Sequence, residues 1–103
     1  MKGLFFGILS LSFLFPGLTR GGDIEAGKTR YAQNCGNCHG PGGMGLASYP
    51  KLRGKEIPYL EDRLKTYRAG KKIGPNSSLM IMMAQPLSDV EIANLAAYLN
   101  AVK

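Results

Sequence analysis

The residues best suited to chemistry are gathered in one short stretch, Asn34 to Gly40, which reads NCGNCHG. It holds both cysteines of the chain, Cys35 and Cys38, and its only histidine, His39. Two thiols and an imidazole at this spacing are able to ligate a metal, to form a redox-active dithiol, or to attach a larger group covalently. The rest of the chain favours one of these three hypotheses.

Two of the hypotheses fit the chain poorly. A structural zinc site needs four ligands, usually in two separated pairs, and the sequence has no second cluster of cysteine and histidine. A redox-active Cys-x-x-Cys lies at the start of a helix that follows a strand, whereas a helical pattern precedes Cys35. A disulfide between Cys35 and Cys38 would close a very small ring and constrain little of the unfolded chain.

The third hypothesis is the covalent attachment of haem c, for which Cys-x-x-Cys-His is the known signal. The two thiols bridge to the vinyl groups on one side of the porphyrin, and the adjacent imidazole reaches the iron as an axial ligand. Because His39 is the only histidine, the other axial ligand cannot be a histidine of this chain. A methionine thioether is the usual alternative.

Four methionines follow the motif and are candidates for this ligand: Met44, Met80, Met82 and Met83. Met44 is so close to His39 that at most about 18 Å of extended chain would have to round the haem edge and reach its opposite face. The cluster LMIMMAQP, residues 79–86, is therefore the better source. Its spacing leaves its three methionines as equal candidates, and at least two of them are expected to fill gaps in an apolar core.

The N-terminal segment has the pattern of an export signal. Lys2 is followed by an uncharged run, residues 3–18, which is shorter than the roughly 20 residues of a membrane-spanning helix. We interpret residues 1–22 as a signal segment, with cleavage expected between residues 17 and 22. An uncleaved N-terminal anchor is the alternative, and either interpretation predicts that the rest of the chain is exported to the periplasm.

Residues 23–103 are then expected to form one small domain. About 80 residues make a marginal apolar core unless a disulfide, a metal or a cofactor supports it. All four phenylalanines lie in the signal segment, and the sequence has no tryptophan. The domain is therefore expected to be built around a non-protein core.

Helical periodicity predicts at least three short helices and no strand. Asp23 is the expected N-cap of a first helix over 24–35, and a proline in the first turn opens a second helix over 58–69. Ser88 and Glu91 have capping-box spacing at the start of a last helix that ends near the C-terminus. Two segments rich in glycine, proline and polar residues are predicted to be loops: residues 40–54 and 71–78.

Positive charge is concentrated between Lys51 and Lys72. This segment holds eight basic residues against three acidic ones, in a chain whose formal net charge is +6. The simplest interpretation is a solvated helix with its flanking loops. The alternatives are electrostatic steering toward an acidic partner protein and binding to a membrane surface. Nucleic acid is not an expected partner of an exported protein.

With these features, the sequence resembles the class I c-type cytochromes, in particular short bacterial cytochromes of the c553 type and the single-haem halves of cytochrome c4. Four blocks carry the resemblance in order: AGKTRYAQNCGNCHGPGGMG, YPKLRG, YLEDRLKTYRAGKK and MIMMAQPLSDVEIANLAAYLNAV. The resemblance implies an all-α cytochrome c fold, with three to five short helices and long loops around one covalently bound haem c and its iron.

The resemblance also implies roles for residues around the motif. Cys35 and Cys38 would carry the haem thioethers, and His39 would be the proximal axial ligand of the iron. Pro50 matches the family proline whose backbone carbonyl accepts a hydrogen bond from the ligand imidazole. That contact would orient the ring and keep it electron-rich.

On the distal side, the family methionine precedes the Leu-Ser-Asp of the last helix by a set interval. Counting seven residues back from Leu87 gives Met80 as the distal axial ligand, and Met82 is the fallback. The resemblance further implies a close crossing of the first and last helices, made by four residues: Gly27, Tyr31, Leu95 and Tyr98.

The function implied is that of a monohaem electron carrier and not of an enzyme, with His/Met-ligated iron cycling between Fe(II) and Fe(III). Its partners would be a donor reductase and an acceptor oxidase or another cytochrome. The carrier itself would be a monomer, and the segment Lys51 to Lys72 is the candidate docking surface. The alternative is a haem-bearing relay subunit of a flavin- or sulfur-oxidising complex. A five-coordinate, ligand-sensing cytochrome is less favoured.

Overall fold

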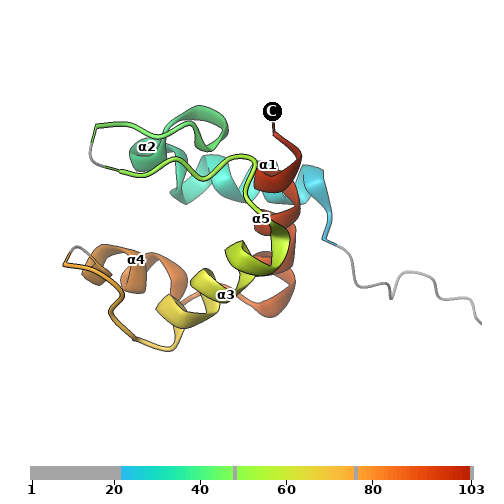
Figure 1. Cartoon of the computed structure of the whole chain (residues 1–103). Helices are drawn as coiled ribbons and strands as arrows, with labels where there is room; N and C mark the ends of the chain where they lie inside the picture. Colours follow the sequence, from blue (N-terminus) through green and yellow to red (C-terminus); the bar gives the residue numbers. More distant parts are fainter. Residues whose placement is uncertain (1–21, 48, 76, 103) are drawn as a thin grey trace, which may run out of the picture.

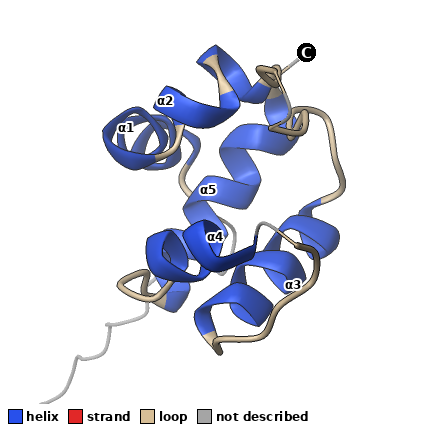
Figure 2. Ribbon diagram, turned by 90° about the vertical axis from the view of Figure 1, so that its left-hand side faces the viewer, coloured by secondary structure: helices blue, strands red, loops and turns tan. Residues whose placement is uncertain are grey.

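The computed structural model describes residues 22–47, 49–75 and 77–102, and over these residues the chain is helical, with no β-strand (Figure 2). The pairing nearest to a strand is a single β-bridge between Leu46 and Tyr49. The predicted all-α class is confirmed. The proposed signal segment lies outside the described residues, apart from Gly22.

The described residues form five α-helices and one 3₁₀ turn (Figure 1). In chain order these elements are α1 (Ile24–Asn34), α2 (Gly36–His39), η3 (Pro41–Gly43), α3 (Ile57–Arg68), α4 (Ser77–Ala84) and α5 (Asp89–Ala101).

Local capping explains where two of the helices begin. The Asp23 carboxylate accepts a hydrogen bond from the Ala26 amide at 3.1 Å, which satisfies a free donor in the first turn of α1. At α5, the Ser88 hydroxyl accepts from the Glu91 amide and the Glu91 carboxylate accepts from the Ser88 amide. Both predicted caps are therefore confirmed.

The expected crossing of the first and last helices is also confirmed, because α1 and α5 pack closely against each other. Gly27 allows this approach, since a Cβ atom at its position would lie 2.0 Å from the Asn94 carbonyl oxygen. Next to it, the Tyr31 and Tyr98 rings pack with their centroids 5.6 Å apart. The buried core gathers at this crossing and extends to α3 and the end of α4: Tyr31, Leu60, Ala84, Leu87, Ile92, Leu95, Ala96 and Leu99.

Two loop predictions need correction. The predicted loop 40–54 contains the 3₁₀ turn Pro41–Gly43, in which glycines at positive φ close tight turns. The predicted loop 71–78 ends two residues early, because α4 already begins at Ser77. The Ser77 hydroxyl accepts hydrogen bonds from the amides of Ile73 and Gly74, both at 2.8 Å, and so folds the loop back onto the start of the helix. The apolar run LMIMMAQP, to which no element was assigned, supplies most of this helix.

Candidate haem-binding site

The Cys-x-x-Cys-His motif forms one short helical turn directly after α1. Cys35 ends α1 by donating its amide to the Tyr31 carbonyl, and the His39 amide donates to the Cys35 carbonyl at 3.0 Å. Both thiols are free and partly exposed, so they are open to chemical modification from outside. Burial raises the pKa of the Cys35 thiol, which keeps it protonated and argues against a redox-active dithiol.

The His39 ring is buried and its orientation is set by a backbone group. Its side chain is 7% exposed, and its Nδ1 atom lies 3.0 Å from the Pro50 carbonyl oxygen. A carbonyl oxygen only accepts, so Nδ1 must carry the proton and donate it. The other ring nitrogen, Nε2, is then left with its lone pair for a metal ion.

The backbone that follows His39 is held by side chains from two other parts of the chain. The Tyr31 hydroxyl donates to the Gly40 carbonyl at 2.5 Å, and burial raises the pKa of this tyrosine to about 12. Arg53 Nε donates to the Gly42 carbonyl at 3.2 Å. These contacts tie the motif both to α1 and to the segment that carries Pro50, and therefore support the hydrogen bond to His39.

On the other side of the site, the faces of α4 separate the methionines. At about 100° per residue, Met80 lies within about 60° of Ser77 and Ala84, which are both buried. Met82 is two residues further along and therefore lies on nearly the opposite face of α4 from Met80, and it is 58% exposed. Met83 is 37% exposed and lies nearer to the direction of Met80. The face of α4 that meets the protein is thus the one that carries Met80.

The helices that carry the two candidate axial ligands lie on the same side of the molecule. Figure 1 shows α2, with the motif, and α4 on one side, away from the crossing of α1 and α5, and Figure 2 shows α2 above α4. On α4 and on the segments that follow the motif and precede α4, several large apolar side chains are exposed: Met44, Leu46, Tyr49, Ile73, Leu79, Met82 and Met83. An extended apolar surface of this kind is typical of a binding site.

These features fit haem and not a bare metal ion. Two free thiols, an imidazole with an available Nε2 and an apolar surround match the thioethers, the axial ligand and the porphyrin of haem c. Among the described residues, no group of three histidine, cysteine or acidic side chains is placed to hold a metal ion. The structure therefore offers no support for the zinc hypothesis.

Comparison with known proteins identifies the class. The cytochrome c family matches residues 24–103, so the chain belongs to the cytochrome c family. Cytochrome c-554(548) of Halomonas halodenitrificans is 47% identical over 81 residues, which cover 78% of this chain and 96% of that protein. A thiosulfate dehydrogenase electron acceptor of Thiomonas intermedia is 40% identical over 74 residues, which cover 70% of this chain and 33% of that protein.

A solved structure supports the same fold. The crystal structure of reduced recombinant cytochrome c4 from Pseudomonas stutzeri matches with a TM-score of 0.70 and 25% identity, over 82% of this chain and 53% of that one. Family membership establishes covalently bound haem c with its iron as the cofactor, and electron transfer as the function. The predicted resemblance, cofactor and electron-carrier function are thereby confirmed.

Several residues of the site were not found from the sequence. Arg53 and the Tyr31 hydroxyl support the backbone after His39, and Arg68 joins α3 to the corner before α5. Tyr31 was expected only as a helix-crossing residue, and the two arginines were counted only as part of a basic segment. For Arg53, its place three residues after Pro50 was the available signal. For Arg68 there was none, because its partners lie about twenty residues further along the chain.

Proposed function

We propose that this chain is a periplasmic monohaem electron carrier in which Cys35 and Cys38 hold the haem, His39 is the proximal ligand and Met80 the distal ligand. The observation that carries the proposal is the hydrogen bond from His39 Nδ1 to the Pro50 carbonyl, because it leaves Nε2 free as a ligand for iron, in the same helical turn as the two thiols. The haem supplies one-electron Fe(II)/Fe(III) chemistry, and the chain supplies ligands, burial and orientation.

The ordered surroundings of the site suit a carrier better than an enzyme or a sensor. His39 is buried, its ring is fixed by Pro50, and the backbone after it is tied down by Tyr31 and Arg53. A site held in this way is expected to change little when the iron gains or loses an electron, as a carrier requires. The choice of Met80 over Met82 rests on the family interval before Leu87. Because the two methionines lie on different faces of α4, single substitutions can tell them apart.

The export part of the proposal places a signal segment at residues 1–22 and one cytochrome domain at residues 23–103. The cytochrome c match begins at residue 24, one residue after the proposed start of the domain. Among the described residues, no helix is both long and apolar enough to cross a membrane. The covalent attachment that the motif calls for takes place outside the cytoplasm, which supports a periplasmic location.

One experiment tests the haem attachment and the export parts of the proposal. The full chain is produced in a bacterium with periplasmic haem c attachment, and the intact mass and the oxidised and reduced absorption spectra are measured. We expect the added mass of one haem, a low-spin c-type spectrum and an N-terminus between residues 17 and 23. The matched variant is Cys35→Ala with Cys38→Ala, in which the haem mass should be lost. A wild-type protein without haem mass would refute the proposal.

For partners, we propose that the basic segment steers the protein toward an acidic redox partner. Of its eight cationic residues, Arg53 and Arg68 are used inside the fold. Six remain for steering: Lys51, Lys55, Arg63, Lys65, Lys71 and Lys72. Lys55 and Arg63 both lie over the Tyr59 ring, 5.7 and 5.1 Å from its centroid, which concentrates charge and aromatic surface at the start of α3. The rate of electron exchange with such a partner should fall as salt is added.

The second candidate is a relay subunit of a sulfur-oxidising complex. It is favoured by the likeness to thiosulfate dehydrogenase electron acceptors, one of which is 40% identical. It predicts that the protein co-purifies with a catalytic subunit, whereas the free carrier purifies alone as a monomer. Size-exclusion chromatography of the protein from its native host separates the two.

A further inference from the structure

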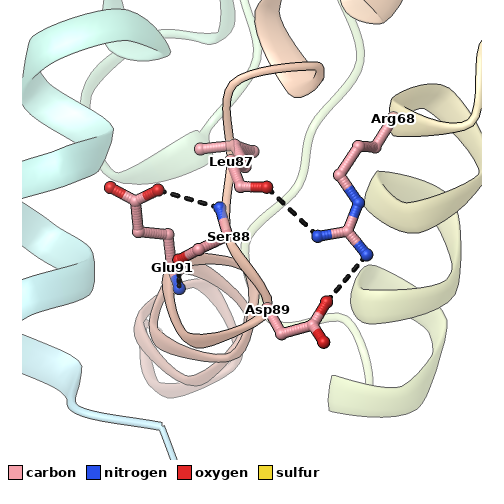
Figure 3. A network of polar contacts seen from close by, with 5 residues as sticks. All are labelled: Arg68, Leu87, Ser88, Asp89 and Glu91. Carbon is pink, nitrogen blue, oxygen red and sulfur yellow. Dashed lines mark hydrogen bonds and ion pairs between the residues drawn. The ribbon is translucent and has the colours of Figure 1, made fainter.

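Arg68 connects α3 to the corner between α4 and α5. It lies in the last turn of α3, and its guanidinium reaches the corner between α4 and α5 (Figure 3). One nitrogen, Nη1, donates to the Leu87 carbonyl at 3.1 Å, and the other, Nη2, donates to the Asp89 carboxylate at 2.7 Å. The ion pair keeps the pKa of Asp89 below its usual range. A single side chain therefore holds both the backbone and a charged group of this corner.

The corner itself is rigid on its α5 side. Leu87 is buried in the core, and the reciprocal hydrogen bonds of Ser88 and Glu91 fix the start of α5 (Figure 3). The first turn of α5 also has a contact with α1, because the Arg30 guanidinium lies 3.6 Å from the Glu91 carboxylate. Contacts from α1, α3 and α5 thus converge on the residues that immediately follow α4.

In contrast, α4 is a short helix of eight residues that is buried mainly at its two ends, Ser77 and Ala84. It packs against α3, and its start is organised by the Ser77 hydroxyl, which accepts hydrogen bonds from two amides of the preceding loop. Its end runs through a tight turn in which the Leu87 amide donates to the Ala84 carbonyl at 3.0 Å. A displacement of Leu87 would therefore be passed directly to the last turn of α4, and Met80 lies only one turn before that end.

We infer that Arg68 is a positioning residue for the distal ligand: by holding the Leu87 carbonyl and the Asp89 carboxylate, it keeps α4 docked on α3 and the Met80 thioether at the iron. The inference rests on the proposed role of Met80. It goes beyond that role because it assigns the control of ligand retention to a side chain that does not touch the cofactor. Without Arg68, α4 with its methionine swings away from the iron more often.

Imidazole binding measures how often the distal coordination position of the iron, which Met80 is proposed to occupy, is open. Added to the oxidised holoprotein, it binds only when the methionine has left, so its apparent affinity is proportional to the open fraction. In Arg68→Met, which keeps much of the apolar stem but has no donor, we expect imidazole to bind roughly five- to tenfold more tightly, since both contacts of a partly exposed charged group are lost. The far-red thioether-to-ferric band should disappear at correspondingly lower imidazole concentrations.

Three further variants separate positioning from a general loss of stability. Arg68→Lys retains one charged donor and should restore part of the wild-type affinity. Asp89→Asn leaves the bond to the Leu87 carbonyl and should change the affinity about twofold or less. Arg63→Met, on the same helix, removes a guanidinium that lies over Tyr59 and not at the corner, and it should behave as wild type. Urea unfolding of each variant is measured in parallel.

The outcomes are distinct. A tighter imidazole complex in Arg68→Met, with partial rescue by lysine, supports the inference. If Arg68→Met unfolds at lower urea but binds imidazole as the wild type does, Arg68 is a purely structural residue and the inference is wrong. If the wild-type protein lacks the far-red band before imidazole is added, the proposed methionine ligation itself has failed.

Discussion

His39 and Pro50, eleven residues apart in the chain, are joined by a 3.0 Å hydrogen bond in which the imidazole Nδ1 donates to the proline carbonyl. The contact keeps the ring electron-rich, which favours ferric iron. Pro50→Ala retains the carbonyl but loses the fixed φ of proline, so the bond should loosen and the reduction potential should rise. A loss of about 1 kcal/mol corresponds to a rise of roughly 40 mV.

The control for this prediction is Pro58→Ala, in which an exposed proline at the start of α3 is replaced. Cyclic voltammetry of the three proteins at one pH measures the effect. A potential that is the same in Pro50→Ala as in the wild type would show that the bond does not depend on the proline ring.

The distal ligand can be identified by comparing methionine substitutions. Met80→Ala should abolish the far-red thioether-to-ferric band and lower the reduction potential strongly, because methionine ligation raises it. Met82→Ala should keep both, since the family interval before Leu87 gives Met80 as the ligand and Met82 lies on a different face of α4 from Met80. Loss of the band in Met82→Ala and not in Met80→Ala would move the assignment to the fallback residue. A spectrum and potential unchanged in every single methionine variant would favour the five-coordinate sensor.

The buried hydroxyl of Tyr31 should make the protein sensitive to alkali. Burial raises its pKa from 10.0 to about 12 in the folded state. A group whose pKa is raised on folding contributes stability that is complete below pH 10 and is lost as the pH rises toward 12. The stability at stake is therefore on the order of 1 to 2 kcal/mol of the free energy of unfolding.

The test compares the wild type with Tyr31→Phe. Between pH 9 and 12, the free energy of unfolding should fall more steeply in the wild type than in the variant, measured by urea titration at several pH values. Tyr59→Phe, at a tyrosine that is 45% exposed, serves as the control and should follow the wild type. Parallel curves for wild type and Tyr31→Phe would contradict the prediction.

The crossing of α1 and α5 should tolerate no side chain at Gly27. A Cβ atom there would lie 2.0 Å from the Asn94 carbonyl oxygen and 2.9 Å from the Tyr98 Cβ, and backbone atoms cannot move aside cheaply. Gly27→Ala should therefore reduce the free energy of unfolding by about 3 kcal/mol or more. At Gly74, a Cβ would meet nothing within 4 Å, so Gly74→Ala should be close to neutral. Equal stability of the two variants in thermal unfolding would show that the helices separate easily.

The sequence was most informative where neighbouring residues decide the structure. A helix cap needs only residues within one turn, so Asp23, Ser88 and Glu91 could be assigned from their spacing and are confirmed. The helix α4 was not predicted. The Ser77 hydroxyl at its first residue accepts from the amides of Ile73 and Gly74 in the preceding loop, and that pattern is not visible in hydrophobic periodicity.

By itself, the sequence determined the kind of site this protein has, because two thiols and an imidazole within one turn of chain are a local feature that needs no fold to be recognised. The resemblance implied the hydrogen bond between His39 and the Pro50 carbonyl, and the tertiary structure supplied its geometry. Only the tertiary structure decided how the α4 segment is held. The Pro50 carbonyl reaches His39 across 11 residues, and Arg68 reaches Leu87 across 19. Such hydrogen bonds form only after the helices have packed, and the packing places their donors and acceptors within 3 Å or so of each other.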